Sequence, residues 1–373
     1  LDDGQIEGYV ESLGTPGAQL QLLLEREPRL RSLARSPLML SIMAAGTPMR
    51  TVATPDDRRH DVFELYIDAM FDRRGGTPPE ARARTLAQLS WLARSLHRRS
   101  LSELWIERMQ PHWFEARRLR VAFIVLVLLT VTVLHVGINV AANVLVDGVE
   151  LGLSTGLSLG LISTPIIFVF TGIGRVRPVE ALRWSWRNTI TSMPRALGLG
   201  ALGGLAFGMV FEPLSGVVMG LAGGALVGFV SGLSVVDIGQ HTRPNEGIRQ
   251  SARNAVGVFL LVAAVSGPFH GYVVVPVAQR LVGDLSLVGI VPGWSVIVGS
   301  AVLYGMILGL IRGGVAVIQH AWLRALARGA GLLPWDLPGL LDRACERAVM
   351  RRVGGGYIFL HRSLLEHLAA RPP

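Results

Sequence analysis

Long apolar runs occupy the middle of the chain, and all but the third have the length of a membrane-crossing helix. About 20 mostly apolar residues suffice to cross a hydrocarbon core ~30 Å thick. The third run is the shortest, and a turn at Glu212 and Pro213 would join it to the fourth. The pattern predicts six transmembrane spans, at 121–146, 151–174, 196–211, 214–236, 255–278 and 287–311, in a membrane region of 120–311.

The two ends of the chain read as soluble protein, and apolar residues recur at helical spacing in the N-terminal one. Residues 1–50 predict short helices, one of them from Leu38 to Ala45 with Pro37 at its first position, where proline costs no hydrogen bond. Segment 56–116 predicts three more helices, the last from Leu101 to Met109. Residues 331–373 form the second soluble end.

Basic residues mark alternate connections between the spans. Arginines precede the first span and follow the sixth, and they also fill the connections between the second and third and between the fourth and fifth. The remaining connections are acidic or nearly uncharged. Because basic loops stay in the cytoplasm, both soluble ends are predicted to be cytoplasmic, and a bacterial plasma membrane is the expected location.

Two of the basic connections repeat each other. Residues 177–188 and 243–254 are identical at seven of twelve aligned positions. Each has proline near its start, then an acidic residue, then arginines, which is typical of the start of a helix. We expect two amphipathic helices lying on the cytoplasmic membrane surface, the first anchored by Trp184 and Trp186.

Glycine recurs at every fourth position within the spans. Small residues at this spacing let helix backbones approach closely in lipid, so the pattern predicts a tight bundle with little lumen. The ladders are 152, 156, 160; 200, 204, 208; 216, 220, 224, 228, 232; and 305, 309, 313.

Composition narrows the chemistry further. Half of the residues are hydrophobic and 17% are charged, and the net charge is +9. No nucleic-acid-binding motif accompanies that charge, so no nucleic-acid partner is expected. All basic residues are arginine, so a phosphate-binding loop that ends in Gly-Lys-[Ser/Thr] is excluded. The single cysteine, Cys345, excludes a disulfide framework.

Other polar motifs have structural interpretations. Two overlapping G-x-S-x-G matches within 152–160 belong to a glycine ladder. The functional alternative to this structural interpretation is an intramembrane serine protease with His270 as its base. His135, Asn139 and Asn143 form a polar stripe that is either functional or a set of interhelical hydrogen bonds, and we favour the second. His361, Glu366 and His367 lack a metal-binding spacing, so we assign neither a metal site nor a catalytic residue.

The two soluble ends resemble parts of NACHT proteins, which are signalling ATPases of the STAND class. Residues 33–40, LARSPLML, are similar to the NACHT helical-domain motif, and residues 1–10 are similar to the segment that follows the nucleotide-binding core of these proteins. Residues 357–370, YIFLHRSLLEHLAA, resemble a stretch of the NACHT winged-helix domain, with His367 where an aromatic residue is usual. The membrane region resembles that of a bacterial subset of the family.

This resemblance implies an all-α membrane protein whose six-helix bundle is inserted into a small cytoplasmic helical and winged-helix domain. Residues 1–50 would end the helical domain, and 56–116 and 331–373 would form the two parts of the winged-helix domain. Pro37 would lie near the adenine, and His361 would contact the ADP phosphate and hold the inactive state. ATP and ADP would bind only with an N-terminal nucleotide-binding domain that precedes this sequence, so this part should not hydrolyse ATP alone.

Two functions remain open at this stage. The first is the membrane-anchored part of a nucleotide-dependent switch in bacterial stress or phage defence, with the lipid bilayer, the nucleotide-binding domain and further copies of the chain as partners. The second is a transporter or channel subunit with accessory cytoplasmic ends. A phosphate-binding loop upstream in the gene would favour the first.

Overall fold

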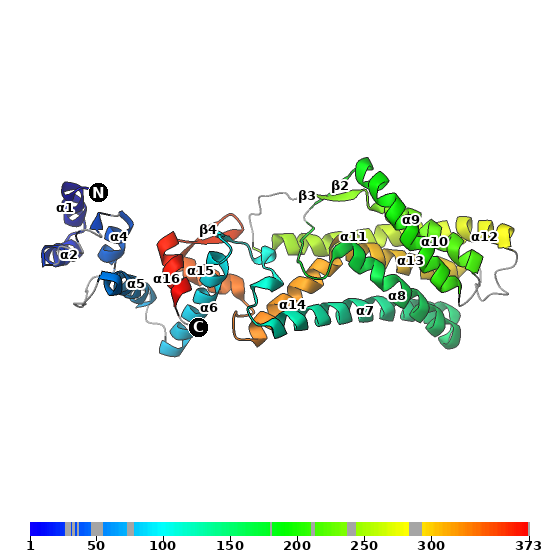
Figure 1. The fold of residues 1–373 in the computed structure, drawn as a ribbon, viewed down its shortest axis with the longest axis horizontal. Coiled ribbons are helices and arrows are strands. Elements are labelled where there is room, and N and C mark those ends of the chain that lie inside the picture. Colours follow the sequence, from blue (N-terminus) through cyan, green and yellow to red (C-terminus); the bar gives the residue numbers. More distant parts are fainter. Residues whose placement is uncertain are drawn as a thin grey trace. The chain divides into compact units, whose positions relative to one another are not determined.

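The computed structural model describes residues 1–26, 31, 34–35, 37–45, 55–72, 78–179, 181–209, 213–236, 244–282 and 293–371. The chain divides into two units, one formed by Leu1–Trp105 and Ala327–Pro373 and the other by Ile106–Leu326. The described part is mostly helical (Figure 1). Glu212, Arg243, Asp284 and the predicted start of the sixth span lie outside the described residues.

The first unit is made from both ends of the sequence. Its helices are α1 (Asp3–Ser12), α2 (Thr15–Arg26), α4 (Pro37–Ala45), α5 (Pro55–Asp72), α6 (Pro79–His97), α15 (Leu337–Glu346) and α16 (Arg362–Ala370). Asp2 caps α1 in a reciprocal arrangement with Gln5, and Asp336 caps α15 by accepting from the Gly339 amide. Helix α4 begins at Pro37, which confirms the helix predicted with proline at its first position.

A small antiparallel sheet joins the two ends within this unit. Strands β4 (Met350–Val353) and β5 (Gly356–Phe359) form a hairpin, and β1 (Glu103–Leu104) pairs with β5, Leu104 opposite Tyr357. The predicted helix from Leu101 to Met109 is wrong. Its place is taken by β1 and a short 3₁₀ helix at Ile106–Arg108, because an unpaired strand edge 250 residues away offers these residues a backbone partner.

The second unit contains the apolar helices. In the described part of the chain, four helices are long and apolar enough to cross a membrane. Those of the first two spans are α7 (Arg117–Asp147) and α8 (Val149–Thr171). The third runs through α11 (Glu246–Phe269), the π-helical segment His270–Val274 and α12 (Val275–Val282), and the fourth through α13 (Trp294–Gly309) and α14 (Val315–Gly329).

Helix α7 shows how such a helix divides its surface. Its buried positions recur at every fourth residue, from Phe123 and Val127 to Asn139 and Asn143. Its opposite side exposes large apolar side chains, with Leu145 86% exposed. A helix that is apolar on its exposed face is suited to lipid rather than to water.

The third and fourth predicted spans form a shorter hairpin, α9 (Trp186–Gly208) and α10 (Pro213–Val230). Arg187 and Arg195 lie in the first half of α9, which leaves only its second half continuously apolar. The two helices meet backbone to backbone. A Cβ atom at Gly200 would lie 2.2 Å from the carbonyl oxygen of Gly220, and one at Gly220 would lie 2.1 Å from that of Gly200.

The repeated connections do not form a matching pair of surface helices. In the first repeat, residues 181–184 form strand β2 (Ala181–Trp184), which pairs with β3 (Leu233–Val236), so the predicted helix there is wrong. In the second repeat, helix α11 begins at Glu246, so the residues from there on are the first turns of that long helix and not a separate surface helix. Strand β3 also ends the fourth span earlier than predicted, because a short segment with three apolar residues out of four fits a strand as well as a helix.

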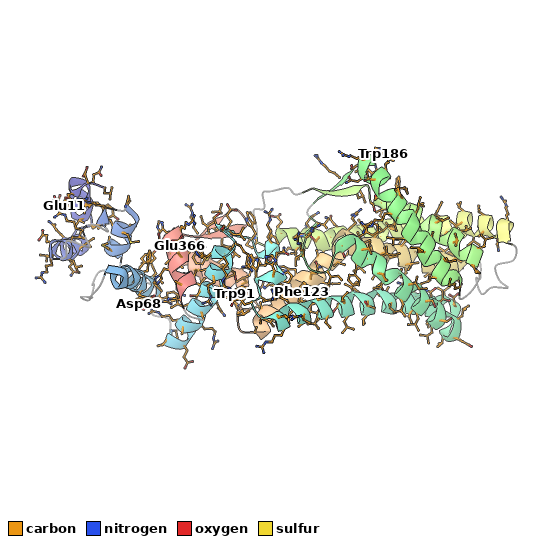
Figure 2. All side chains as sticks on the ribbon, in the orientation of Figure 1. Glu11, Asp68, Trp91, Phe123, Trp186 and Glu366 are labelled. Atoms are coloured by element: carbon orange, nitrogen blue, oxygen red, sulfur yellow. The ribbon has the colours of Figure 1, made fainter. Side chains whose placement is uncertain are left out.

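Aromatic side chains accompany this strand pair. Trp184 packs against Phe229 with 4.6 Å between ring centroids, and Trp186 is 64% exposed. Figure 2 shows Trp186 at the outer edge of the second unit, where α9 begins. The fold class of an all-α protein therefore needs correction, because short strands are present in both units.

Candidate functional site

Pro37 and His361, the two residues expected to contact a nucleotide, lie on different elements of the first unit. Pro37 is the exposed first residue of α4. His361 is half-buried and precedes α16, where its backbone is extended. Among the described residues, no hydrogen bond or ion pair joins the two positions, so each must be considered separately.

The β4–β5 hairpin positions His361. Tyr357 is fully buried on β5 and donates a hydrogen bond to Asp342 on α15 at 2.8 Å. Gly354 has a φ of 58° and lies in the tight turn between the strands, where a left-handed backbone favours glycine. The Leu360 amide donates to the carbonyl of Val349 at 3.1 Å. His361 therefore leaves a well-supported strand and enters a helix.

The start of α16 carries positive potential. His361 occupies the N-cap position, but its side chain accepts no hydrogen bond from the amides of the first turn, and that turn contains no acidic residue. Burial, reinforced by the nearby Arg351 guanidinium, holds the pKa of His361 below its usual value. Free amides at a helix N-terminus, together with arginine, form an arrangement that attracts phosphate or carboxylate groups.

A second polar cluster connects α5 with α16. Glu64 accepts hydrogen bonds from His367 Nε2 at 2.7 Å and from Arg371 Nε at 3.0 Å, and also forms an ion pair with the Arg371 Nη2 group. Burial tends to raise the pKa of Glu64, but the His367 and Arg371 partners outweigh it and lower the pKa to about 2. His367 also stacks on Phe63, with centroids 5.1 Å apart. This cluster holds α5, from the N-terminal part of the chain, against α16, from its C-terminal part.

The polar stripe of α7 faces α8. His135 Nε2 lies 2.8 Å from the hydroxyl oxygen of Ser163, an interhelical hydrogen bond. Asn139 and Asn143 each donate from their Nδ2 atoms to the backbone carbonyl four residues earlier, at 2.8 Å. The His135 contact is the interhelical bond that the structural interpretation expects, whereas the two asparagine bonds stay within α7.

The G-x-S-x-G residues do not form a nucleophile site. The hydroxyl of Ser154 is exposed and donates to the Leu151 carbonyl of its own helix. A Cβ at Gly156 would lie 2.5 Å from the Val140 Cα, which shows that this glycine allows α8 to pack closely on α7. His270 is buried and interacts instead with the backbone of Ser266.

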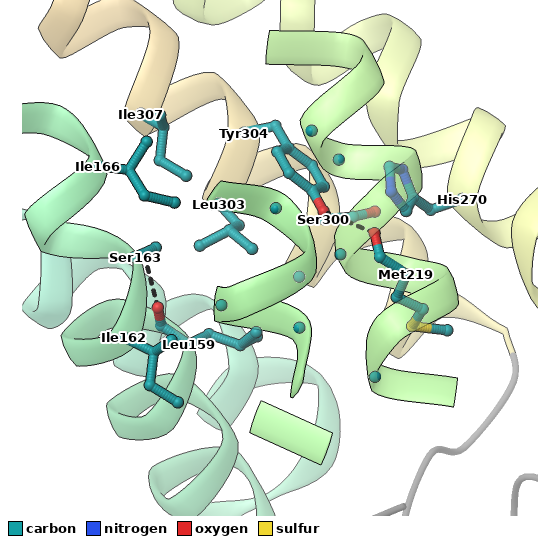
Figure 3. Close-up of a pocket in the computed structure, with 18 of the residues that line it drawn as sticks. Leu159, Ile162, Ser163, Ile166, Met219, His270, Ser300, Leu303, Tyr304 and Ile307 are labelled. Atoms are coloured by element: carbon teal, nitrogen blue, oxygen red, sulfur yellow. Dashed lines mark hydrogen bonds between the residues drawn. The ribbon is translucent and has the colours of Figure 1, made fainter. Parts of the chain in front are cut away.

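The second unit contains a cavity of about 170 Å³ that the sequence did not predict. Figure 3 shows Leu159, Ile162 and Ser163 of α8 on one side, with Leu303 and Tyr304 of α13 across from them. Glycines of α9 and α10 line the remaining wall. His270 also lines the cavity, and its ring stacks on Tyr304 with 4.7 Å between centroids.

Comparisons of the chain with protein-family models, with curated proteins and with solved structures found no match.

Proposed function

We propose that this chain is the membrane-anchored C-terminal portion of a NACHT-type, nucleotide-dependent signalling switch in bacterial stress or phage defence. In this proposal the first unit is a winged-helix-like domain interrupted by the membrane region. The nucleotide is bound jointly with a nucleotide-binding domain encoded upstream, which carries the phosphate-binding loop and hydrolyses ATP. His361 contacts the ADP phosphate in the inactive state.

The observation that best supports the proposal is the joining of the two soluble ends. Tyr66 donates a hydrogen bond to the Ala348 carbonyl at 2.8 Å, and Arg94 donates to the Arg371 carbonyl at 2.6 Å. These two bonds span 282 and 277 residues of sequence, and the β1–β5 pairing links the same two ends of the chain. Helices followed by a strand, a further helix and a hairpin are what an interrupted winged-helix domain would contain.

The surroundings of His361 support a phosphate contact. Its position at the uncapped start of α16 places it beside amides that can donate to a phosphate, and Arg351 adds a positive charge nearby. Hydrogen bonds to charged groups contribute about 1.5–3 kcal/mol each. Loss of such a contact would shift a two-state switch toward its open form by at least several-fold.

We expect His361→Ala to weaken ADP binding about tenfold or more in the protein that includes the upstream nucleotide-binding domain. The measurement is ADP affinity by titration calorimetry in detergent. The matched control is His97→Ala, which removes an exposed histidine at the end of α6 in the same unit. Equal ADP affinities for wild type and His361→Ala would remove His361 from the nucleotide site and weaken the NACHT assignment with it.

We also propose that the membrane region has six spans with both termini in the cytoplasm, with the α9–α10 hairpin as the third and fourth spans and the glycine ladders packing the helices. The arginine pattern and the backbone contact between Gly200 and Gly220 support this topology. Helix α10 has 18 residues, which is enough to cross the core with little tilt.

Cysteine labelling of intact cells tests the topology. Cys345 is first replaced by serine, although burial and the charge of Asp342 already raise the pKa of its thiol to about 11. Glu150→Cys should then react with an impermeant maleimide, while Arg183→Cys and Arg249→Cys should react only after the cells are permeabilised. All three positions are exposed in the structure, so different reactivity reports the side of the membrane. Labelling of Arg183→Cys in intact cells would contradict the model.

A second candidate is a transporter or channel subunit with accessory soluble ends, which would have to use the cavity in the second unit. A transported molecule would need a polar path, whereas the described lining is mostly apolar. The upstream gene sequence distinguishes the candidates, because only the switch requires a Gly-Lys-[Ser/Thr] phosphate-binding loop there.

A further inference from the structure

The cavity of the second unit is long and narrow. Along α8 its lining residues run from Leu151 to Phe170 on one face, which corresponds to about 28 Å at 1.5 Å per residue. A volume of about 170 Å³ spread over this length leaves room for a single extended chain rather than for a compact molecule. A partly open apolar space of this shape among membrane helices is accessible to the chains of bilayer lipids.

His270 lines the cavity and has one buried polar atom without a partner. The residue is 2% exposed, and its Nε2 atom is buried without a hydrogen-bond partner among the described residues. A buried polar atom in this state costs free energy unless something else satisfies it. An unmet polar atom in an apolar cavity therefore indicates a missing ligand group.

The partner of the other ring nitrogen determines what that group must be. His270 Nδ1 lies 2.9 Å from the carbonyl oxygen of Ser266. A carbonyl can only accept, so Nδ1 carries the proton, and in a neutral imidazole Nε2 is then an acceptor. The matching ligand group is a hydrogen-bond donor, which an ester or ketone carbonyl is not.

We propose that the cavity binds an uncharged, single-chain lipid alcohol from the bilayer, with its hydroxyl group donating to His270 Nε2 and its alkyl chain extending along α8. An anionic headgroup is excluded because no arginine side chain lines the cavity among the described residues, and the charged residue that does line it is the carboxylate Asp147. The stacked Tyr304 ring fixes the imidazole plane and so the direction of the acceptor. This lipid site does not depend on the nucleotide switch proposed above, and its test gives a result whether or not that switch exists.

The test compares 1-dodecanol with dodecyl methyl ether, which has the same chain but no donor. Native mass spectrometry of the purified chain in detergent should show one saturable dodecanol per chain, with the ether binding about tenfold more weakly. His270→Phe should remove this preference by binding the two compounds alike. Equal binding of alcohol and ether by wild type would overturn the proposal, because it would show that Nε2 recognises no hydroxyl group.

Two glycines of α9 provide a matched pair that leaves His270 intact. Gly203 lines the cavity, and a Cβ there would meet only a methyl of Ile162 at 3.8 Å, so Gly203→Leu should fill the cavity without displacing backbone. A Cβ at Gly198 would meet nothing within 4 Å, and this residue does not line the cavity. Gly203→Leu should abolish dodecanol binding, and Gly198→Leu should bind as wild type does. Wild-type binding by Gly203→Leu would overturn the cavity as the site.

Discussion

Gly220→Leu should separate α9 from α10 and lower the free energy of unfolding by about 3 kcal/mol or more. The added Cβ would lie 2.1 Å from the Gly200 carbonyl oxygen and 2.7 Å from the Gly204 Cα, and backbone atoms cannot move aside as a flexible side chain can. Because close backbone approach supplies much of the attraction between helices in lipid, the hairpin would lose packing along its whole contact. The thermal midpoint in detergent measures the loss.

Gly198→Leu is the control for this prediction. It makes the same substitution in the same hairpin at an exposed position where a Cβ meets nothing within 4 Å. Its thermal midpoint should stay close to that of wild type. If Gly220→Leu is as stable as Gly198→Leu, the two helices do not pack through their glycines.

Glu64→Ala should destabilise the first unit by about 2–4 kcal/mol, because it leaves the largely buried His367 and Arg371 without their shared acceptor. Hydrogen exchange of α5 and α16, read by mass spectrometry, separates this unit from the membrane helices. The control is Glu366→Gln, which breaks only the surface pair with Arg362 and should change stability by less than about 0.5 kcal/mol. Equal exchange in both variants would contradict the role of the cluster.

The same carboxylate should give the first unit an acid-sensitive stability. The pKa of Glu64 is lowered in the folded state from 4.5 to about 2, so its contribution is complete above pH 4.5 and is lost as the pH falls toward 2. The contribution is about 3 kcal/mol at most, since the side chain is 29% exposed. Glu64→Gln should lack this loss when α5 and α16 exchange is compared with wild type at each pH. A parallel decline in both proteins would assign acid sensitivity to other groups.

Local signals in the sequence were sufficient for the long helices. Helices α7 and α8 follow from run length alone, and Pro37 correctly marked the start of α4, because these features depend on residues within a few turns. Strand pairing depends on distant partners. The segment containing Trp184 was predicted as a helix, since nothing near it in sequence reveals that Leu233 lies opposite.

The cavity and the Glu64 cluster could not have been predicted for a related reason. His270 stood out in the sequence only as a hypothetical catalytic base, and its unpaired Nε2 depends on how α11, α10 and α13 pack. Glu64 and Arg371 are 307 positions apart, and ordinary charged residues at that separation carry no pairing signal. The contact of His367 with Glu64 is equally long-range, so no local pattern in the sequence indicates it.

The backbone contact between α9 and α10 also has a genetic consequence. Every glycine codon begins with two guanines, and a change at either base introduces a side chain no smaller than that of alanine. At Gly200, Gly204, Gly216 and Gly220 even that methyl group would overlap a carbonyl oxygen of the facing helix, so these positions tolerate only synonymous changes. A saturation screen should therefore record intolerance along the hairpin with a period of four residues, interrupted by permissive glycines such as Gly198.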